Sequence, residues 1–146
     1  MGIRLVLDTS VMVAALRSDR GASRRLLVGT LRGRFTLLVS VPLMVEYQSV
    51  LVLPEHLEAA RVSAGDVDGI LSALAAVLEP VRLAYLWRPL LKDPADEMVL
   101  ETAVNGGADL LCTLNIRDFE PARQFGIPVL NPGEAWQRVE EFHENK

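Results

Sequence analysis

The sequence predicts an α/β fold: a three-layer α/β/α sandwich with a central, mostly parallel sheet. Short apolar runs alternate with segments of helical spacing along all 146 residues, half of which are apolar. The apolar runs contain few polar residues, as in parallel strands that are buried on both faces. Proline, glycine and capping residues separate the segments. Strands that recur between helices therefore favour a sheet covered by helices on both sides.

The N-terminal segment is expected to be a strand that leads directly into a helix. Residues 3–7 are apolar and β-branched, and helical spacing begins at Asp8 or Thr9, either of which suits an N-cap. Gly21 separates this helix from a second one, expected over residues 22–33. The chain therefore opens with one strand and two helices.

The next segment repeats this order. Residues 35–40 are expected to form the second strand, Pro42 opens the helix that follows, and Pro54 closes it. Beyond that helix, a lid or hairpin of helices is expected over residues 55–79.

A capping box is expected within this hairpin. Ser63 and Asp66 have the spacing at which each side chain accepts a hydrogen bond from the backbone of the other residue. Pro80 then stops the second helix, and residues 81–86 are expected to form the third strand.

The following helix has clear start and stop signals. Asp93 supplies the cap, Pro94 takes the first helical position, and Gly106 and Gly107 end the helix as a left-handed cap. A buried strand is expected directly afterwards, over residues 108–113.

The C-terminal segment adds a last short strand and a helix within residues 126–142. The charged tail, residues 143–146, is expected to fray. No repeat, low-complexity run or linker interrupts the chain, and its length suits one compact core. A single domain over residues 1–142 is therefore expected.

The composition favours a cytoplasmic protein. The single cysteine, Cys112, lies in an apolar run, where a thiol is usually core filler, and no second cysteine allows an intrachain disulfide. Asp8 and Arg17 interrupt the N-terminal apolar stretch, so neither a signal peptide nor a membrane span is expected.

Positive charge is concentrated in one segment. The net charge is −4, yet residues 17–34 contain six arginines and one acidic residue, Asp19, so this segment alone carries +5. Arginine matches phosphate oxygens in two-point contacts, which makes Arg24 and Arg25 candidate contacts for an RNA backbone. The ordinary alternative is a solvated helix face, and the sequence leaves both interpretations open.

Four acidic residues follow different apolar runs of the chain. They are Asp8, Glu46, Asp96 and Asp118. In an open parallel sheet the carboxyl ends of the strands share one edge, where the ligand crevice lies, so these carboxylates are expected to converge. Crowded carboxylates repel unless a cation neutralises them. Because no histidine or cysteine accompanies them, the expected ion is Mg²⁺ or Mn²⁺, which prefer oxygen ligands.

Neutral polar residues near the same strand ends are expected to support these acids. Their side chains orient ligands or bind a metal-bound water. The neutral supporting residues are Thr9, Ser10, Thr113 and Asn115, and Asp93 is expected to support the site as well. Among the acids, Glu46 carries particular weight, because it interrupts the apolar first turns of its helix.

Each acid also has an ordinary structural interpretation, which the sequence leaves open. An acidic residue at the start of a helix caps the helix or interacts with its dipole, and needs no chemistry. This interpretation applies to Asp8, Asp93 and Asp96. In the same way, Asn115 and Asp118 suit a tight turn, and Glu46 suits an exposed helix face.

Three motifs together span nearly the whole chain. An apolar strand leads into Asp-Thr-Ser in VLDTSVMVAAL, and a glutamate lies early in the helix after the second strand in VPLMVEY. A longer block, DPADEMVLETAVNGGADLLCT, joins an aspartate and a helix to Gly-Ala-Asp, a strand and a threonine. These motifs resemble the PIN-domain family of metal-dependent ribonucleases, especially the prokaryotic toxins of toxin–antitoxin pairs.

By this resemblance, Asp8, Glu46 and Asp96 form the acidic core of the site. Many family members place Gly-Asp directly after the threonine, whereas this chain has Leu-Asn there and Asp118 three residues after Asn115. A branch of the toxins is similar to this Asn-x-x-Asp-Phe form. The resemblance therefore implies that Asp118 is the fourth acid and that Asn115 assists it.

The resemblance also implies endonucleolytic cleavage of RNA with Mg²⁺ or Mn²⁺, a small antitoxin as partner, and a homodimer. The alternative is a catalytically inactive module of the same fold that binds RNA or a protein. Two other classes are disfavoured. Phosphatases of the aspartyl-phosphate class need a second acid where this chain has Ser10, and no Gly-x-Gly-x-x-Gly of a dinucleotide-binding protein follows the first strand.

Overall fold

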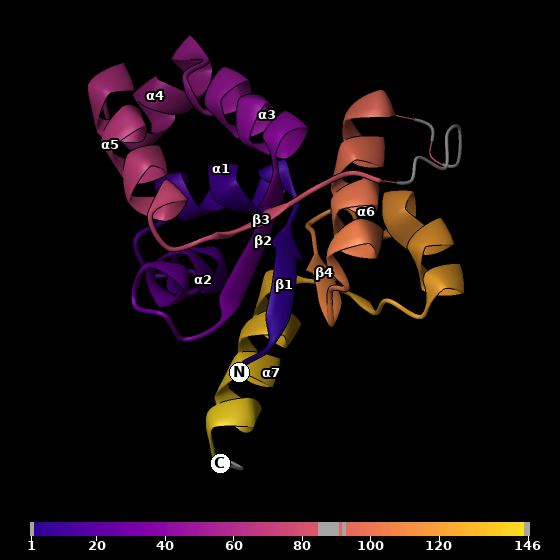
Figure 1. The fold of residues 1–146 in the computed structure, drawn as a ribbon. Coiled ribbons are helices and arrows are strands. Elements are labelled where there is room, and N and C mark those ends of the chain that lie inside the picture. Colours follow the sequence, from indigo (N-terminus) through magenta and orange to yellow (C-terminus); the bar gives the residue numbers. More distant parts are fainter. Residues whose placement is uncertain (1, 85–90, 92, 145–146) are drawn as a thin grey trace.

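The computed structural model describes residues 2–84, 91 and 93–144, and these residues are built around a parallel sheet (Figure 1). Its five strands lie in the order β3-β2-β1-β4-β5, and each neighbouring pair is parallel. The strands are β1 (Arg4–Leu7), β2 (Thr36–Ser40), β3 (Glu79–Val81), β4 (Leu110–Cys112) and β5 (Val129–Leu130). The predicted α/β class is confirmed.

Helices connect the strands and cover both faces of the sheet. On one side α2 packs against α1 and α7, and on the other α6 lies against β1 and β2 (Figure 1). The helices are α1 (Thr9–Arg17), α2 (Ala22–Leu31), α3 (Val41–Leu51), α4 (Pro54–Ala60), α5 (Ala64–Ala75), α6 (Pro94–Gly106) and α7 (Pro132–Glu144), with a 3₁₀ segment, η1 (Ile116–Phe125). None of these described helices has the length and apolar character needed to cross a membrane.

β1 lies at the point of the sheet where the strand order reverses. The chain adds β2 and β3 on one side of β1, and later adds β4 and β5 on the other. Leu7 at the end of β1 is in register with Cys112 at the end of β4, so these two strands stop at the same level. In open α/β sheets the ligand crevice lies outside the carboxyl ends of the strands at this point. Asp8 and Thr113 directly follow the two strand ends.

Tyr47 joins α3 to the end of β1. Its side chain is fully buried, and its hydroxyl donates a hydrogen bond of 2.5 Å to the carbonyl oxygen of Leu7. Burial raises the pKa of this phenol well above its ordinary value, so the hydroxyl remains a neutral donor. The helix that carries Glu46 is thereby held beside the strand that directly precedes Asp8.

The third strand lies earlier in the chain than expected. The strand predicted over residues 81–86 is instead β3 at Glu79–Val81, and residues 85 and 86 lie outside the described part of the chain. Pro80 is accommodated because β3 is an edge strand, where a missing backbone N–H costs no ladder bond on the free side. The Arg4 guanidinium donates hydrogen bonds of 2.9 and 2.6 Å to the Glu79 carboxylate, which fixes β3 at this position.

Two helix boundaries also differ from expectation. Pro54 begins α4 instead of closing α3, because proline fits the first turn of a helix, where its missing N–H has no partner to lose. The last helix continues to Glu144, and His143 Nε2 donates a hydrogen bond of 2.6 Å to the carbonyl oxygen of Arg34. Two residues of the expected frayed tail are therefore helical, and residues 145–146 lie outside the described part.

Other predicted boundaries are confirmed. The Asp66 N–H donates to Ser63 Oγ at 3.0 Å, and the Ser63 N–H donates to Asp66 Oδ2 at 2.8 Å, which is the predicted capping box of α5. Gly107 adopts a left-handed φ of 64° at the end of α6. The pair of helices expected within residues 55–79 is formed by α4 and α5, although α5 ends at Ala75 and Glu79 already belongs to β3.

Candidate metal centre

A polar pocket of about 220 Å³ opens at the carboxyl end of β1. Its walls come from the first turns of α1 and α6 and from the middle of α3. Seven residues of the predicted site line it: Asp8, Thr9, Ser10, Glu46, Asp93, Asp96 and Asn115. Residues from four distant parts of the sequence thus meet at the predicted edge of the sheet.

The Asp8 carboxylate is held by hydroxyl groups and does not cap α1. Its Oδ2 atom accepts hydrogen bonds from Ser10 Oγ at 2.7 Å and from Thr113 Oγ1 at 2.8 Å, and the side chain makes no capping hydrogen bond to α1. Asp8 is only 5% exposed. The ordinary N-cap interpretation of its side chain is therefore wrong, and a buried carboxylate faces the pocket.

The same two hydroxyls fix the loop after β4. Ser10 Oγ accepts a hydrogen bond of 3.2 Å from the Leu114 N–H, and Thr113 Oγ1 accepts one of 2.9 Å from the Asn115 N–H. Each hydroxyl thus accepts from the backbone and donates to Asp8. This network orients the carboxylate and places Asn115 at the rim of the pocket.

Asp96 experiences the charge of the whole cluster. Its pKa is raised from 3.8 to about 7, first by burial and then by repulsion from four carboxylates, Asp8, Asp93, Asp118 and Glu46. Asp93 has a structural role as well, because its Oδ1 accepts a hydrogen bond of 2.9 Å from the Ala95 N–H and caps α6. The ordinary cap interpretation is thus confirmed for Asp93, and Asp96 lies in the crowded pocket.

Glu46 is half-buried in α3, and buried polar residues that the sequence analysis missed position this helix. Ser40 Oγ accepts a hydrogen bond of 3.3 Å from the Leu43 N–H and lies 2.6 Å from Thr102 Oγ1. Ser40 was recognisable as a cap because it stands directly before Val-Pro at a helix start. Tyr47 and Thr102 gave no such signal, because their partners are distant in the sequence.

Asp118 lies outside the lining of the pocket. It is exposed at the start of η1, whereas Asn115 lines the pocket. Asp118 is nevertheless close enough to contribute to the raised pKa of Asp96. The structure therefore brings Asn115 into the site and leaves Asp118 as an outer charge.

The two arginines predicted to contact RNA lie away from this pocket. Arg24 Nε donates a hydrogen bond of 2.6 Å to the Ala15 carbonyl, and its Nη2 atom donates one of 3.3 Å to the Leu16 carbonyl. Arg24 therefore binds the C-terminal end of α1, while Arg25 is exposed. Both line a separate cavity beside Trp136.

Residues 4–117 match the sequence profile of the PIN domain, which covers most of the chain. The chain belongs to the PIN-domain family. This PIN domain also resembles solved structures, whereas no curated protein sequence gave a match. The family assignment covers β1 through the start of η1 and includes every element that lines the acidic pocket.

The structural neighbours share the fold at low sequence identity. VapBC2 from Rickettsia felis, solved with a promoter DNA fragment, aligns with a TM-score of 0.59 and 16% identity over 88% of this chain and 98% of the other. FitAcB from Neisseria gonorrhoeae aligns with a TM-score of 0.56 and 18% identity over 88% and 98%. FitAB bound to an IR36 DNA fragment gives 0.56 and 18% over 90% and 95%.

The donor atoms of the PIN-domain pocket suit Mg²⁺ or Mn²⁺. The candidate ligands are all oxygen atoms, and Thr9 Oγ1 is buried with no hydrogen-bond partner among the described residues. A divalent cation would also neutralise the repulsion that raises the pKa of Asp96. Within the described residues, however, no three acidic, histidine or cysteine side chains already form a metal-binding cluster. The pocket fits the ion chemically, and its carboxylates would draw together around it.

We expect Asp118→Asn to weaken Mn²⁺ binding severalfold, and more than Asn115→Ala does. Asp118 supplies negative charge to the pocket from outside, whereas Asn115 supplies only a neutral amide. Calorimetric titration of Mn²⁺ into the two variants measures the difference. An Asp118→Asn protein that binds Mn²⁺ like the parent would remove Asp118 from the site. In that case Asn115→Asp, which adds the missing charge inside the pocket, should tighten binding.

Proposed function

We propose that this PIN domain is a Mg²⁺- or Mn²⁺-dependent endoribonuclease and the toxin of a toxin–antitoxin pair. The observation that carries the proposal is the convergence of Asp8, Glu46 and Asp96 on one pocket at the carboxyl end of β1. Membership of the PIN-domain family supports nuclease chemistry at this pocket. The motifs shared with prokaryotic toxins, together with the similarity to VapBC2 and FitAcB, support the toxin role.

The three carboxylates have different places in the proposed reaction. Asp8 and Asp96 would hold the ion, because Asp8 directly follows β1, Asp96 lies in the first turn of α6, and both line the pocket. Glu46 faces the same pocket from α3 and would bind the ion or orient the attacking water. When bound, the ion would lower the pKa of a water and stabilise charge on the phosphate and the leaving oxygen. The hydroxyls of Ser10 and Thr113 would keep the Asp8 carboxylate in place.

We also propose a small antitoxin and a second copy of the chain as partners. Both follow from the resemblance to prokaryotic toxins, whose members are paired with an antitoxin and commonly dimerise. The similarity to the FitAB and VapBC2 structures supports a partner protein of this kind.

A circular single-stranded RNA provides the test of the proposed reaction. Only an endonuclease converts a circle into a linear product, so the appearance of linear RNA identifies internal cleavage. We expect linear product with Mn²⁺ or Mg²⁺ and none in EDTA. The assay should include several circles that differ in sequence and in secondary structure.

Loss of the linear product in Asp8→Asn separates this activity from a contaminating nuclease, and a matched variant controls for the substitution itself. Asp68 is an exposed aspartate of α5 outside the pocket, so Asp68→Asn should retain the parent rate. The alternative function, an inactive module that binds RNA or a protein, is motivated by the neutral Asn115 at the pocket rim. Mn²⁺ binding without cleavage of any of these RNAs would favour that alternative and contradict the nuclease.

A further inference from the structure

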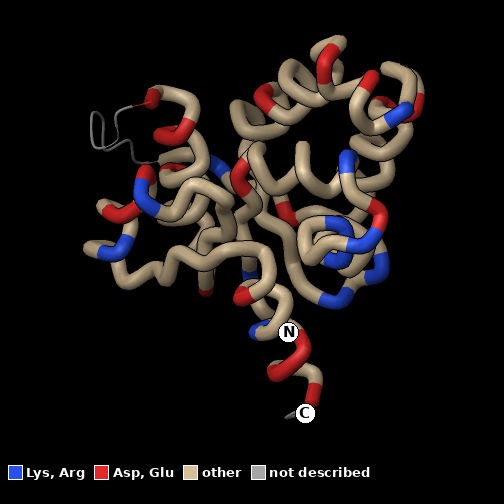
Figure 2. Tube along the Cα trace, turned by 180° about the vertical axis from the view of Figure 1, so that it is seen from behind, with Lys and Arg blue, Asp and Glu red and all other residues tan. Residues whose placement is uncertain are grey.

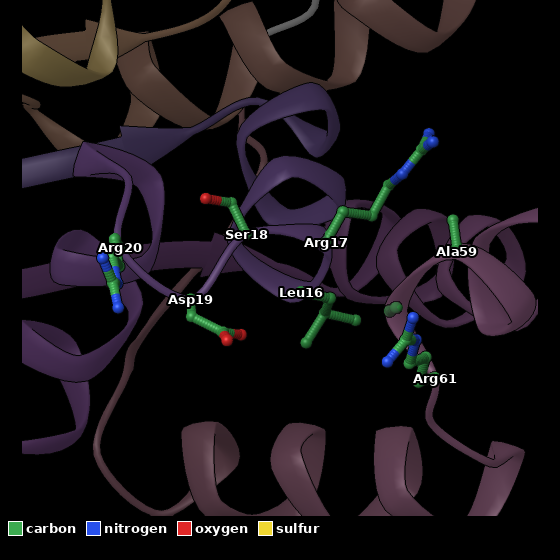
Figure 3. Close-up of a pocket in the computed structure, with 8 residues that line it drawn as sticks. Leu16, Arg17, Ser18, Asp19, Arg20, Ala59 and Arg61 are labelled. Atoms are coloured by element: carbon green, nitrogen blue, oxygen red, sulfur yellow. The ribbon is translucent and has the colours of Figure 1, made fainter.

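A second cavity, of about 620 Å³, lies between the C-terminal end of α1 and α4 (Figure 3). We refer to it as the arginine pocket, because Arg17, Arg20 and Arg61 line it. In Figure 3 the side chains of Arg20 and Arg61 lie on opposite sides of the opening, with Leu16 and Asp19 between them. Arg17 extends away from both in this view.

These three arginines have no side-chain partner among the described residues, in contrast to Arg24 and Arg34. Arg24 binds α1 carbonyls, and Arg34 lies 3.6 Å from the Glu140 carboxylate and stacks over Trp136. The side chains of Arg17, Arg20 and Arg61, in contrast, make no hydrogen bond or ion pair within the described residues. Figure 2 shows that basic positions gather around α2 and the adjoining end of α1. The arginine pocket therefore presents a net positive charge, from three arginines against Asp19.

A third cavity lies between the arginine pocket and the acidic pocket along α1. It has a volume of about 530 Å³ and a mainly apolar lining that includes Val13, Ala14, His56 and Leu114. It shares Ser10 and Val13 with the acidic pocket, and Arg17 and Ser18 with the arginine pocket. Because they share lining residues, the three cavities follow one another along α1, and we refer to them together as the groove.

We propose that the arginine pocket binds a backbone phosphate of single-stranded RNA whose scissile phosphate lies at the acidic pocket. This inference rests on the proposed function. Ser10 and Arg17 are separated by roughly 10 Å along α1, at 1.5 Å per helical residue. At about 3.4 Å of axis per stacked nucleotide, roughly three nucleotides cover this distance. The groove thus sets the register between a phosphate contact and the cleaved bond.

The middle cavity suits the bases of the same strand. Its apolar side chains offer a surface to base faces, and His56 adds an imidazole of the kind on which bases stack. His56 Nδ1 is also buried without a hydrogen-bond partner among the described residues. Apolar contacts in the middle and positive charge at one end match the bases and the phosphates of a single strand.

An acidic protein segment would suit this groove less well. It would pair with the arginines, but its continuation along α1 would meet the carboxylates of Asp8 and Glu46. RNA meets the same carboxylates in the proposed reaction, where a cation lies between them and the phosphate. Asp19 lies in the arginine pocket and opposes either anion, although its carboxylate is 3.9 Å from Arg24, which partly offsets its charge.

The test compares two double variants that remove equal charge. Arg20→Gln with Arg61→Gln alters the arginine pocket, whereas Arg25→Gln with Arg32→Gln removes two exposed arginines of the same basic region outside it. Binding of a fluorescent single-stranded RNA dodecamer is measured in EDTA over a range of salt concentrations. Each lost phosphate contact should reduce the log–log salt slope by about 0.7 on a single strand.

We expect the pocket variant to lose about 0.7 units of slope, for the one phosphate that its two arginines hold, and the control to lose clearly less. Equal slopes for the two variants, or no measurable RNA binding by the parent at low salt, would overturn the proposal. A third outcome would also overturn the proposal: the pocket variant binds RNA with the salt slope of the parent but no longer binds a polyglutamate peptide. That result would identify the arginine pocket as a binding site for an acidic protein segment. Because EDTA prevents metal-dependent cleavage, the result is independent of the circular-RNA assay. If the parent protein cleaves the circular RNA but the two double variants have the same salt slope, only the proposed role of the arginine pocket is contradicted.

Discussion

The Asp8→Asn protein is expected to lose at least about 100-fold of its metal-dependent RNA cleavage. Even residues that only orient metal ligands typically account for 10- to 100-fold of activity, so a carboxylate in the proposed ligand set should account for more. Asn keeps an oxygen that accepts from Ser10 or Thr113, but it removes the charge that would bind the cation. Initial rates on the circular RNA, at saturating Mn²⁺, measure this loss.

The same variant should remain as stable as the parent without metal, or become more stable. Asp8 makes no capping hydrogen bond, and its charge is the first carboxylate contribution to the raised pKa of Asp96. Neutralising Asp8 therefore relieves repulsion. Chemical denaturation of the metal-free proteins measures the difference, with Asp68→Asn as the control. A loss of more than about 2 kcal/mol, the upper range for a deleted cap, would indicate a structural role for Asp8.

The role of Asp8 shows what local sequence can and cannot specify. A strand followed by aspartate and a helical pattern predicted both an N-cap and a site residue. The contact that distinguishes them is the hydrogen bond from Thr113, which is 105 residues away. Local patterns therefore predicted the strand end and the helix start, whereas tertiary packing determined what the side chain does.

Asp118, the fourth predicted acid, shows that local sequence patterns also fail to specify side-chain positions over a few residues. The three-residue spacing of Asn115 and Asp118 predicted a turn that would bring both toward the pocket. The chain instead continues in the 3₁₀ segment Ile116–Phe125, which leaves Asp118 exposed while Asn115 lines the pocket. The direction of a side chain after a strand end depends on the path of the loop, which spacing alone does not give.

The charge composition predicted a basic region but not which of its arginines are available to a ligand. The six arginines within residues 17–34 predicted a basic region, and the structure has one. Arg24, which was singled out, is engaged with backbone carbonyls of α1. Arg61 lies outside that segment and joins Arg17 and Arg20 only because α4 folds beside α1. Which arginines are free for a ligand is a property of the tertiary structure.

Asp96→Asn is expected to stabilise the metal-free protein above about pH 7 and to have little effect near pH 4. The folded-state pKa of Asp96 is about 7, against an ordinary value of 3.8. Between these values the folded protein retains a proton that the unfolded chain has released. Stability contributed by this group is therefore complete below about pH 4 and falls as the pH rises to about 7. Asn has no proton to lose, so the variant lacks this decline.

The size of the effect follows from the partial exposure of Asp96. Solvent screening reduces the energetic consequence of the raised pKa, and we expect a difference of about 1–2 kcal/mol between parent and variant at pH 8. Urea denaturation of both proteins at about pH 4.5, 6 and 8, in EDTA, measures it directly. Parallel pH dependences for the two proteins would contradict the raised pKa and with it the crowding of carboxylates at this pocket.

Metal binding should reverse this pH dependence in the parent. Below about pH 7 a cation must displace the proton of Asp96, so Mn²⁺ affinity should rise steeply between about pH 5.5 and 7.5. Asp96→Asn should bind Mn²⁺ more weakly at all of these pH values and with a flatter profile, because its amide carries no displaceable proton. Calorimetry in two buffers of different ionisation enthalpy reports the released protons. A parent that binds Mn²⁺ near pH 6 without releasing a proton would show that Asp96 is not among the ligands.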